Sequence, residues 1–206
     1  GATIIHYGQG IFEGMKAHKN EKGDLLVFRP YDHHERLNTS AKRMTLPEIP
    51  FNLFFSSIEE LITKFPPQFD STEQGIYFQP RIYNISEGFA PYACDKCEFS
   101  FFATSLTVNP LKSQGVSVEQ QMQRGIKGSV VVVKTAGNYA ASALATKNAR
   151  EANLKHVLWI SPEKLVQELS GMNLFIVDDG KLYTPSLESG TILPGITRKT
   201  VIALAK

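Results

Sequence analysis

A lysine between two contrasting segments is the residue of this sequence with the clearest chemical potential. Lys134 follows residues 129–133, a β-branched run that predicts a buried strand, and precedes residues 140–149, an alanine-rich run that predicts a helix. A lysine at such a junction is held by the sheet while its amine faces a cleft. An amine that loses water there becomes a nucleophile towards carbonyl carbons. The alternative is a solvated lysine at a strand end, which is the commoner state of lysines.

Three further groups could bind a charged ligand. Glu168 supplies a carboxylate, unless it is a solvated helix or loop residue. Gly195 precedes a helix predicted over residues 199–206, and backbone N–H groups at a helix N-terminus bind anions. The alternative there is a simple helix cap by Thr197. Arg36 lies in a helix predicted over residues 31–43, where on the local pattern alone it is a solvated helix charge; a guanidinium there stays charged and presents a fork of donors.

Four motifs in order carry a family resemblance that covers nearly the whole chain. They are His-Tyr-Gly-Gln-Gly-Ile-Phe-Glu-Gly-Met-Lys at 6–16, Lys-Thr-Ala-Gly-Asn-Tyr at 134–139, Val-Gln-Glu-Leu-Ser-Gly-Met-Asn-Leu-Phe at 166–175 and Ile-Leu-Pro-Gly-Ile-Thr-Arg at 192–198. Together they resemble the class IV pyridoxal-phosphate aminotransferases. The motif at 6–16 resembles the branched-chain amino acid aminotransferases within that class.

The resemblance implies pyridoxal 5'-phosphate as cofactor and assigns it a set of binding residues. Lys134 is expected to bind the cofactor covalently and then to move the substrate proton. Glu168 is expected to face the ring nitrogen, where its negative charge favours the protonated ring. Tyr139 is expected to hydrogen-bond the ring hydroxyl, or else to be a half-buried core tyrosine. The phosphate is assigned to Arg36, Ile196 and Thr197.

The substrate pocket is assigned to six residues of the first half of the chain. Tyr7, Phe12 and Gly14 match family positions, and an aromatic wall opposite a glycine suits an aliphatic side chain; they could also be core residues. The other three are Tyr77, Gln79 and Arg81. The family usually carries Tyr-x-Arg-Pro where this chain has Tyr-Phe-Gln-Pro, so Gln79 replaces an arginine. Arg81 is expected on the same strand face and could supply the charge, unless Pro80 breaks the strand.

The expected architecture is α/β (α+β), a two-domain fold type IV pyridoxal-phosphate enzyme. An N-terminal α/β sandwich domain at 1–107 is followed by a polar Pro/Gly linker at 108–115. Residues 116–206 are expected to begin a C-terminal cofactor-binding domain with a mixed or barrel-like sheet, which we expect to be incomplete. Besides those named above, a helix is predicted at 53–65. Strands are predicted at 24–29, 76–85, 98–104, 116–118 and 156–160, and a hairpin at 174–177 and 181–184.

Composition indicates an ordinary globular protein. The chain has 206 residues, 42% of them hydrophobic, and a net charge of +2, which does not indicate a nucleic-acid partner. No apolar run approaches a membrane span, and a cytoplasmic location is expected, although a targeting segment could precede Gly1. Cys94 and Cys97 are expected to be a reduced, incidental pair, because a zinc site would need two more ligands; no metal is predicted.

The function implied by the resemblance is transamination of leucine, isoleucine or valine with 2-oxoglutarate, giving branched-chain 2-oxo acids and glutamate. The partners are therefore small amino acids and 2-oxo acids, and the enzyme is expected to be a homodimer or a higher homo-oligomer. One alternative is a D-amino acid aminotransferase or an aminodeoxychorismate lyase-like enzyme, which generally lack the long motif at 6–16. Another is an inactive fragment that binds no cofactor.

Overall fold

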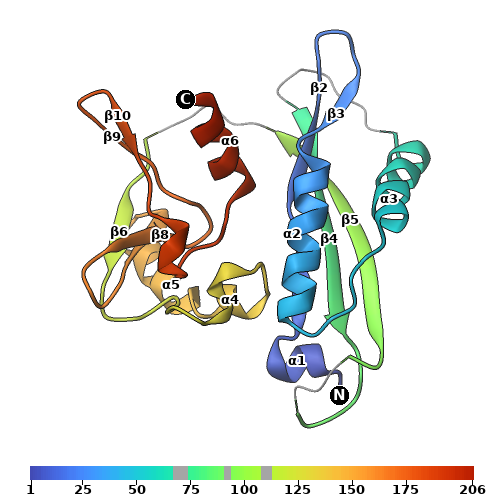
Figure 1. Ribbon diagram of the computed structural model, residues 1–206, viewed down its shortest axis with the longest axis horizontal. Helices are drawn as coiled ribbons and strands as arrows, with labels where there is room; N and C mark the ends of the chain where they lie inside the picture. Colours follow the sequence, from blue (N-terminus) through green and yellow to red (C-terminus); the bar gives the residue numbers. More distant parts are fainter. Residues whose placement is uncertain (67–73, 91–93, 108–112) are drawn as a thin grey trace. The chain divides into compact units, whose positions relative to one another are not determined.

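The computed structural model describes residues 1–66, 74–90, 94–107 and 113–206. The chain divides into two compact units, Gly1–Leu111 and Lys112–Lys206 (Figure 1). The predicted linker at 108–115 spans this division, and its residues 108–112 lie outside the described residues. No helix in the described part of the chain is long and apolar enough to cross a membrane.

The first unit is built on an antiparallel five-stranded sheet. Its longest strands, β4 (Gln74–Asn84) and β5 (Cys97–Thr107), pair over their full length. On its other edge, β4 pairs with β1 (Gly10–Phe12) and then with β2 (Met15–Lys19), and β2 pairs with β3 (Leu25–Val27). Strands β3, β4 and β5 confirm the strands predicted at 24–29, 76–85 and 98–104, although their ends are shifted.

Pro80 lies in the middle of β4 without breaking it. The neighbouring edge is interrupted between β1 and β2, and there the N–H of Glu13 donates to the carbonyl of Pro80 at 2.9 Å. The N and C=O of one residue point to the same side of an extended strand, so the missing N–H of Pro80 faces this interruption. The alternation of buried and half-buried residues therefore continues through Pro80, from Ile76 to Asn84.

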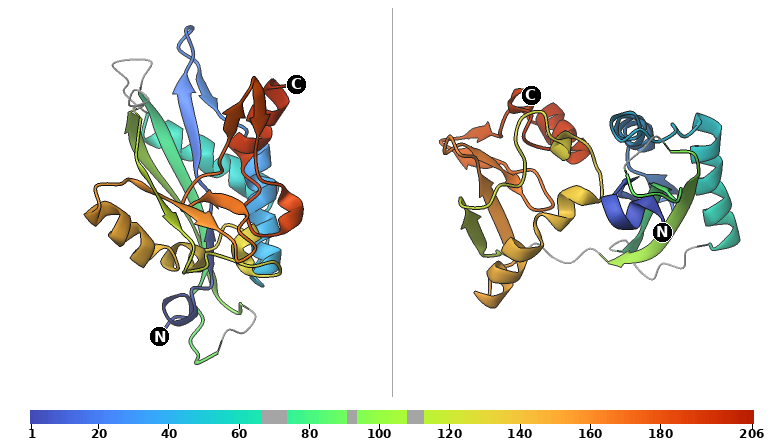
Figure 2. Two further views of the ribbon diagram at one scale, coloured as in Figure 1. Left: turned by 90° about the vertical axis from the view of Figure 1, so that its left-hand side faces the viewer. Right: turned by 90° about the horizontal axis from the view of Figure 1, so that it is seen from below.

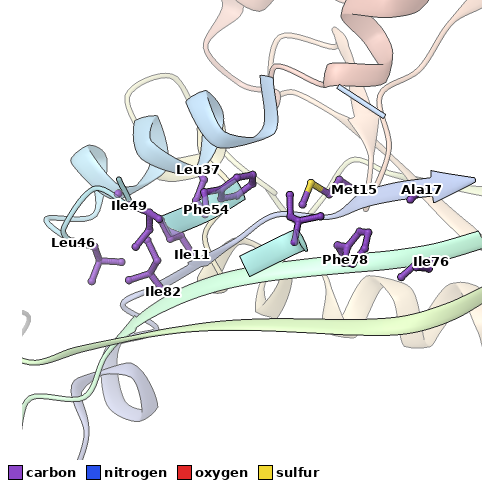
Figure 3. Close-up of a cluster of buried hydrophobic side chains, with 12 residues drawn as sticks. Ile11, Met15, Ala17, Leu37, Leu46, Ile49, Phe54, Ile76, Phe78 and Ile82 are labelled. Atoms are coloured by element: carbon purple, nitrogen blue, oxygen red, sulfur yellow. The ribbon is translucent and has the colours of Figure 1, made fainter. Parts of the chain in front are cut away.

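Two amphipathic helices cover one face of this sheet (Figure 2). Helix α2 (Pro30–Arg43) begins at a proline, which suits the first helical position, and α3 (Phe51–Lys64) follows a short connection. Their apolar stripes close over the inward-facing strand residues (Figure 3). The core residues are Ile11, Met15, Ala17, Leu37, Ala41, Leu46, Ile49, Phe54, Ile58, Ile76, Phe78 and Ile82. A short helix, α1 (Thr3–Tyr7), precedes β1.

The second unit contains a three-stranded mixed sheet. Strand β7 (His156–Ile160) is central, parallel to β6 (Val116–Glu119) and antiparallel to β8 (Val166–Leu169). The crossover between β6 and β7 carries α4 (Gly137–Ala140) and α5 (Ala143–Glu151). Ala145 and Ala149 of α5 pack on Val157 and Trp159 of β7.

The remainder of the second unit is a hairpin and a terminal helix. Strands β9 (Ile176–Asp178) and β10 (Lys181–Tyr183) form the predicted hairpin, and Asp179 and Gly180 both have positive φ, as a tight two-residue turn requires. The segment η2 (Leu187–Ser189) is a 3₁₀ turn. Helix α6 (Ile196–Leu204) begins three residues earlier than predicted.

Two local expectations are wrong. Residues 129–133 do not form a strand: η1 (Val130–Val132) is a 3₁₀ turn that Ser129 caps by accepting from the N–H of Val131. The carbonyls of Val130 and Val133 both accept from Asn138 Nδ2 at 2.8 Å, so a side chain satisfies groups that a sheet would otherwise pair. Cys94 and Cys97, expected to be reduced, are joined in a disulfide, and their Cα separation of 6.2 Å is in the range that such a bond allows.

Candidate active site

The amine of Lys134 points at the hydroxyl of Tyr139. Nζ donates to the phenol oxygen at 2.7 Å and lies 5.1 Å from the ring centroid. Lys134 follows η1 rather than a strand, and Asn138 fixes the backbone on its N-terminal side by bridging two carbonyls of the valine run. The two residues that the resemblance assigned to the reactive end of one ligand are therefore adjacent in space.

Glu168 is a buried carboxylate on β8, not the solvated helix or loop residue of the alternative interpretation. It is 2% exposed. Its Oε1 accepts from Arg124 Nη1 and, at 3.2 Å, from the N–H of Leu193, while Oε2 accepts from Asn173 Nδ2 at 2.8 Å. Burial raises the pKa of Glu168 above its ordinary value; the charges of Arg124 and Lys134 and the Leu193 N–H act in the opposite direction. The direct partners of the carboxylate are therefore Arg124, Asn173 and Leu193, and the charge of Lys134 is the smallest of the named influences on its pKa.

The N-terminus of α6 is the third feature of this unit. Its N-cap is Gly195, which makes no side-chain cap, so Thr197 does not cap the helix as one alternative supposed. The first N–H groups of a helix have no intrahelical acceptor and carry the positive end of its dipole. Ile196 and Thr197 hold the first two helical positions, Ile196 buried and Thr197 exposed. Because the Leu193 N–H binds Glu168, the turn leading into α6 is tied to the buried carboxylate.

Arg36 of the first unit is held by a second buried carboxylate. Its Nε and Nη2 donate to the two oxygens of Glu13 at 2.6 and 2.7 Å, and Glu13 is fully buried. Glu13 Oε2 also contacts His33 Nδ1 at 2.7 Å and accepts from the N–H of Gly14. The pKa of Glu13 is lowered because the hydrogen bonds and charges of Arg36 and His33 outweigh desolvation, the largest single contribution. Arg36 is therefore not the solvated helix charge of the alternative interpretation.

Five of the six predicted substrate residues lie on one face of the first sheet, opposite the helices. In antiparallel register Phe12 lies beside Arg81, and Lys16 beside Tyr77, with partners on the same face. A Cβ on Gly14 would overlap the Tyr77 hydroxyl, so the glycine makes room for the tyrosine.

The remaining predicted substrate residues differ in their surroundings. Gln79 follows Tyr77 on the same face of β4, and the Arg81 guanidinium lies 5.5 Å from the Phe102 ring centroid. Tyr7, at the end of α1, is 41% exposed. The sheet therefore groups five of the predicted residues, and Tyr7 belongs to a separate element.

Four residues of the two carboxylate clusters were not predicted from the sequence. Glu13 and Asn173 lie within the motifs at 6–16 and 166–175, so the motifs themselves were the signal that could have drawn attention to them. His33 precedes Arg36 by nearly one helical turn. Arg124 is 44 residues from Glu168, and no local pattern connects the two.

Comparisons with known proteins identify the family of the chain. The family model described as amino-transferase class IV matches residues 10–206. A probable branched-chain-amino-acid aminotransferase of Staphylococcus epidermidis is 35% identical over the whole chain, and the branched-chain-amino-acid transaminase 1 of Bacillus subtilis is 33% identical. The chain spans 59% of the length of each of these relatives.

Solved structures give the same result. The branched-chain aminotransferase of Thermoproteus uzoniensis with norvaline has 32% identity and a TM-score of 0.80, covering 99% of this chain and 67% of that one. The branched-chain amino acid aminotransferase of Thermobaculum terrenum in its PLP-form (holo-form) has 26% identity and a TM-score of 0.81, covering 96% and 64%. The fold is thus the mixed α/β fold type IV. With the family model matching all but its first nine residues, the chain belongs to the class IV aminotransferase family.

Proposed function

We propose that this protein binds pyridoxal 5'-phosphate in its second unit and transfers amino groups between branched-chain amino acids and 2-oxoglutarate. Two observations of the second unit carry the proposal: the Lys134 amine contacts the Tyr139 phenol, and the Glu168 carboxylate is buried among hydrogen-bond donors. Family membership and the similarity to branched-chain aminotransferases support the substrate class.

The residues present fit the proposed cofactor. A pyridoxal ring needs an amine for its aldehyde, a carboxylate for its ring nitrogen and donors for its phosphate. The second unit offers an amine on Lys134, a carboxylate excluded from water on Glu168, and the N-terminus of α6, tied to that carboxylate through Leu193. Arg124 beside Glu168 favours its ionised form, which is the form that a protonated ring nitrogen requires.

Each residue then has a definite task. When bound, pyridoxal phosphate supplies an electron sink for the carbon that loses its proton. Lys134 Nζ would hold the cofactor and would move the substrate proton. Tyr139 OH, 2.7 Å from Nζ, orients the amine and would serve as a donor to the cofactor ring. Glu168 would place a negative charge at the ring nitrogen, and the N–H groups of Ile196 and Thr197 would bind the phosphate.

The residues assigned in the first unit are part of the same proposal. Arg36 is assigned to the phosphate, and its guanidinium is set in one orientation by Glu13. The face with Phe12, Gly14 and Tyr77 is assigned to the aliphatic substrate, and Gln79 with Arg81 to the acidic one. Tyr7 and the expected homodimer belong to the same proposal; sedimentation of the purified protein tests the dimer.

The experiment that tests this function is covalent trapping. The purified protein is mixed with pyridoxal phosphate, reduced with borohydride and weighed by mass spectrometry. We expect one added cofactor on the parent and on Lys147→Ala, an exposed lysine paired with Glu151, and none on Lys134→Ala. Trapping on Lys134→Ala equal to that on the parent would refute the assignment, and no trapping on the parent would refute the function.

A further inference from the structure

We propose that Asn173 is a positioning residue that locks the Glu168 carboxylate and the turn before α6 into one register. It would thereby fix the separation between the group assigned to the ring nitrogen and the group assigned to the phosphate. This inference rests on the proposed function, because it concerns the two ends of the same cofactor.

The first observation is the double hydrogen bond of one amide nitrogen. Asn173 Nδ2 donates to Glu168 Oε2 at 2.8 Å and to the carbonyl of Leu193 at 2.9 Å. An amide nitrogen has two protons, so both are engaged. The N–H of Leu193 in turn donates to Glu168 Oε1 at 3.2 Å. Asn173, Glu168 and Leu193 therefore form a closed ring of hydrogen bonds, which we call the asparagine bracket.

The chain is folded back to make this possible. Strand β8 ends at Leu169, whose N–H donates to the carbonyl of Met172 at 2.9 Å. The tight turn over residues 170–171 thus returns Asn173 to the side of the carboxylate five residues before it. Asn173 is consequently positioned by backbone pairing rather than by a long, mobile side chain.

The second observation concerns Gly195, the N-cap of α6. A Cβ at this position would overlap Asn173 Oδ1 and lie 3.0 Å from Asn173 Cγ. The backbone angles of Gly195, φ −70° and ψ 134°, are open to any residue, so the space taken by the asparagine and not the backbone conformation requires glycine here. The amide therefore contacts the helix cap with its oxygen while its nitrogen holds the carboxylate and the turn.

The consequence is a coupling between two ends of a ligand. Removing the Asn173 amide leaves Glu168 with Arg124 and the Leu193 N–H, but it releases the Leu193 carbonyl and opens space beside Gly195. The carboxylate then moves relative to the N-terminus of α6. A ligand without a phosphate loses only the alignment of its ring, whereas one with a phosphate loses both alignments.

The test compares pyridoxal phosphate with pyridoxal, which has the same ring and no phosphate. Dissociation constants are measured on the purified protein from the fluorescence of Trp159, the only tryptophan. For Asn173→Ala we expect a roughly ten- to hundredfold larger dissociation constant for pyridoxal phosphate, because two hydrogen bonds to polar partners are lost. The dissociation constant for pyridoxal should rise less. The exposed residue Asn148 gives the matched control, Asn148→Ala, in which both constants stay unchanged.

A double-mutant cycle supplies an independent measurement. Gly195→Ala alone should weaken pyridoxal phosphate because its Cβ meets the asparagine, whereas Gly195→Ala added to Asn173→Ala should cost much less. Should Asn173→Ala fold poorly, Asn173→Ser retains one donor and should show the same selective loss to a smaller degree. In the protein without cofactor, hydrogen exchange at the Leu193 amide should also be faster in Asn173→Ala and in Asn173→Ser than in the parent.

Three outcomes would overturn the asparagine bracket. They are equal losses for the two ligands in Asn173→Ala, additive losses in the cycle with Gly195→Ala, and unchanged exchange at the Leu193 amide. If the parent protein bound neither ligand, the proposed function would fall and the inference with it. Because the exchange measurement needs no ligand, failure of the bracket and failure of the function are distinguishable.

Discussion

Replacing Glu13 by glutamine should destabilise the first unit strongly. The carboxylate is fully buried and contacts Arg36 twice, His33 once and the N–H of Gly14. A glutamine of the same shape keeps one acceptor oxygen, but it turns an N–H group towards a donor and leaves the guanidinium without its counter-charge. Arg36 is itself mostly buried, with a side chain that is 13% exposed, so water can only partly replace that charge.

The size of the effect follows from this burial. Breaking a buried ion pair by removing one partner costs about 3–5 kcal/mol, because the other charge stays behind uncompensated. Urea unfolding followed by circular dichroism at pH 7 measures the difference in unfolding free energy. Glu35→Gln, at an exposed glutamate next to Arg36 on α2, serves as the control and should behave like the parent.

The difference should also depend on pH in a defined direction. The folded protein lowers the pKa of Glu13 from its ordinary value of 4.5, so the carboxylate contributes its full stability above pH 4.5. That contribution is lost as the pH falls through the lowered folded pKa, where the parent becomes protonated and resembles the variant. We therefore expect a large difference in unfolding free energy between the parent and Glu13→Gln at pH 7, and we expect this difference to disappear in acid. A gap that is small at pH 7, or that stays constant on acidification, would refute the reasoning.

Three further substitutions test the site. Glu168→Gln should leave pyridoxal phosphate bound but slow proton transfer by a barrier on the order of a few kcal/mol, and an unchanged single-turnover rate would remove Glu168 from the site. Arg36→Ala should raise the dissociation constant of pyridoxal phosphate more than it lowers turnover at saturating cofactor; equal affinities in variant and parent would contradict its role. Arg81→Ala should raise the Michaelis constant for 2-oxoglutarate roughly ten- to hundredfold more than that for leucine, and equal changes would make Arg81 structural.

Much of the fold could be predicted because local signals agreed with tertiary packing. The apolar spacing of α2 and α3, the turn at residues 178–180 and the alternation along β4 all predicted elements that the structure contains. The common face of Tyr77, Gln79 and Arg81 followed from a period of two, since Pro80 meets a gap in the neighbouring edge. The roles of the site residues came from motifs and stay predictions.

What failed or was missed depended on partners distant in sequence or on competing side chains. The sequence at 129–133 favours a strand by propensity. The side chains of Ser129 and Asn138 instead hydrogen-bond the backbone of this segment and stabilise a 3₁₀ turn. Arg124 is an ordinary charged residue until the fold places it against Glu168. Asn173 gains its meaning only from the turn that returns it to the carboxylate. No local pattern encodes the approach of Arg124 to Glu168, which are 44 residues apart.

The parallel pairing of β6 with β7 has a consequence for the order of events during folding. Parallel neighbours cannot be joined by a tight turn, and here residues 120–155, with Lys134 among them, form the crossover between the two strands. Closing so long a loop costs entropy before any strand contact offsets it, so this pairing belongs to the slow steps of assembly. Lys134 and Tyr139 are five residues apart within this crossover, so their contact is local. Glu168 lies beyond the crossover on β8, which pairs with β7. The full surroundings that we propose for the lysine are therefore complete only together with the native sheet.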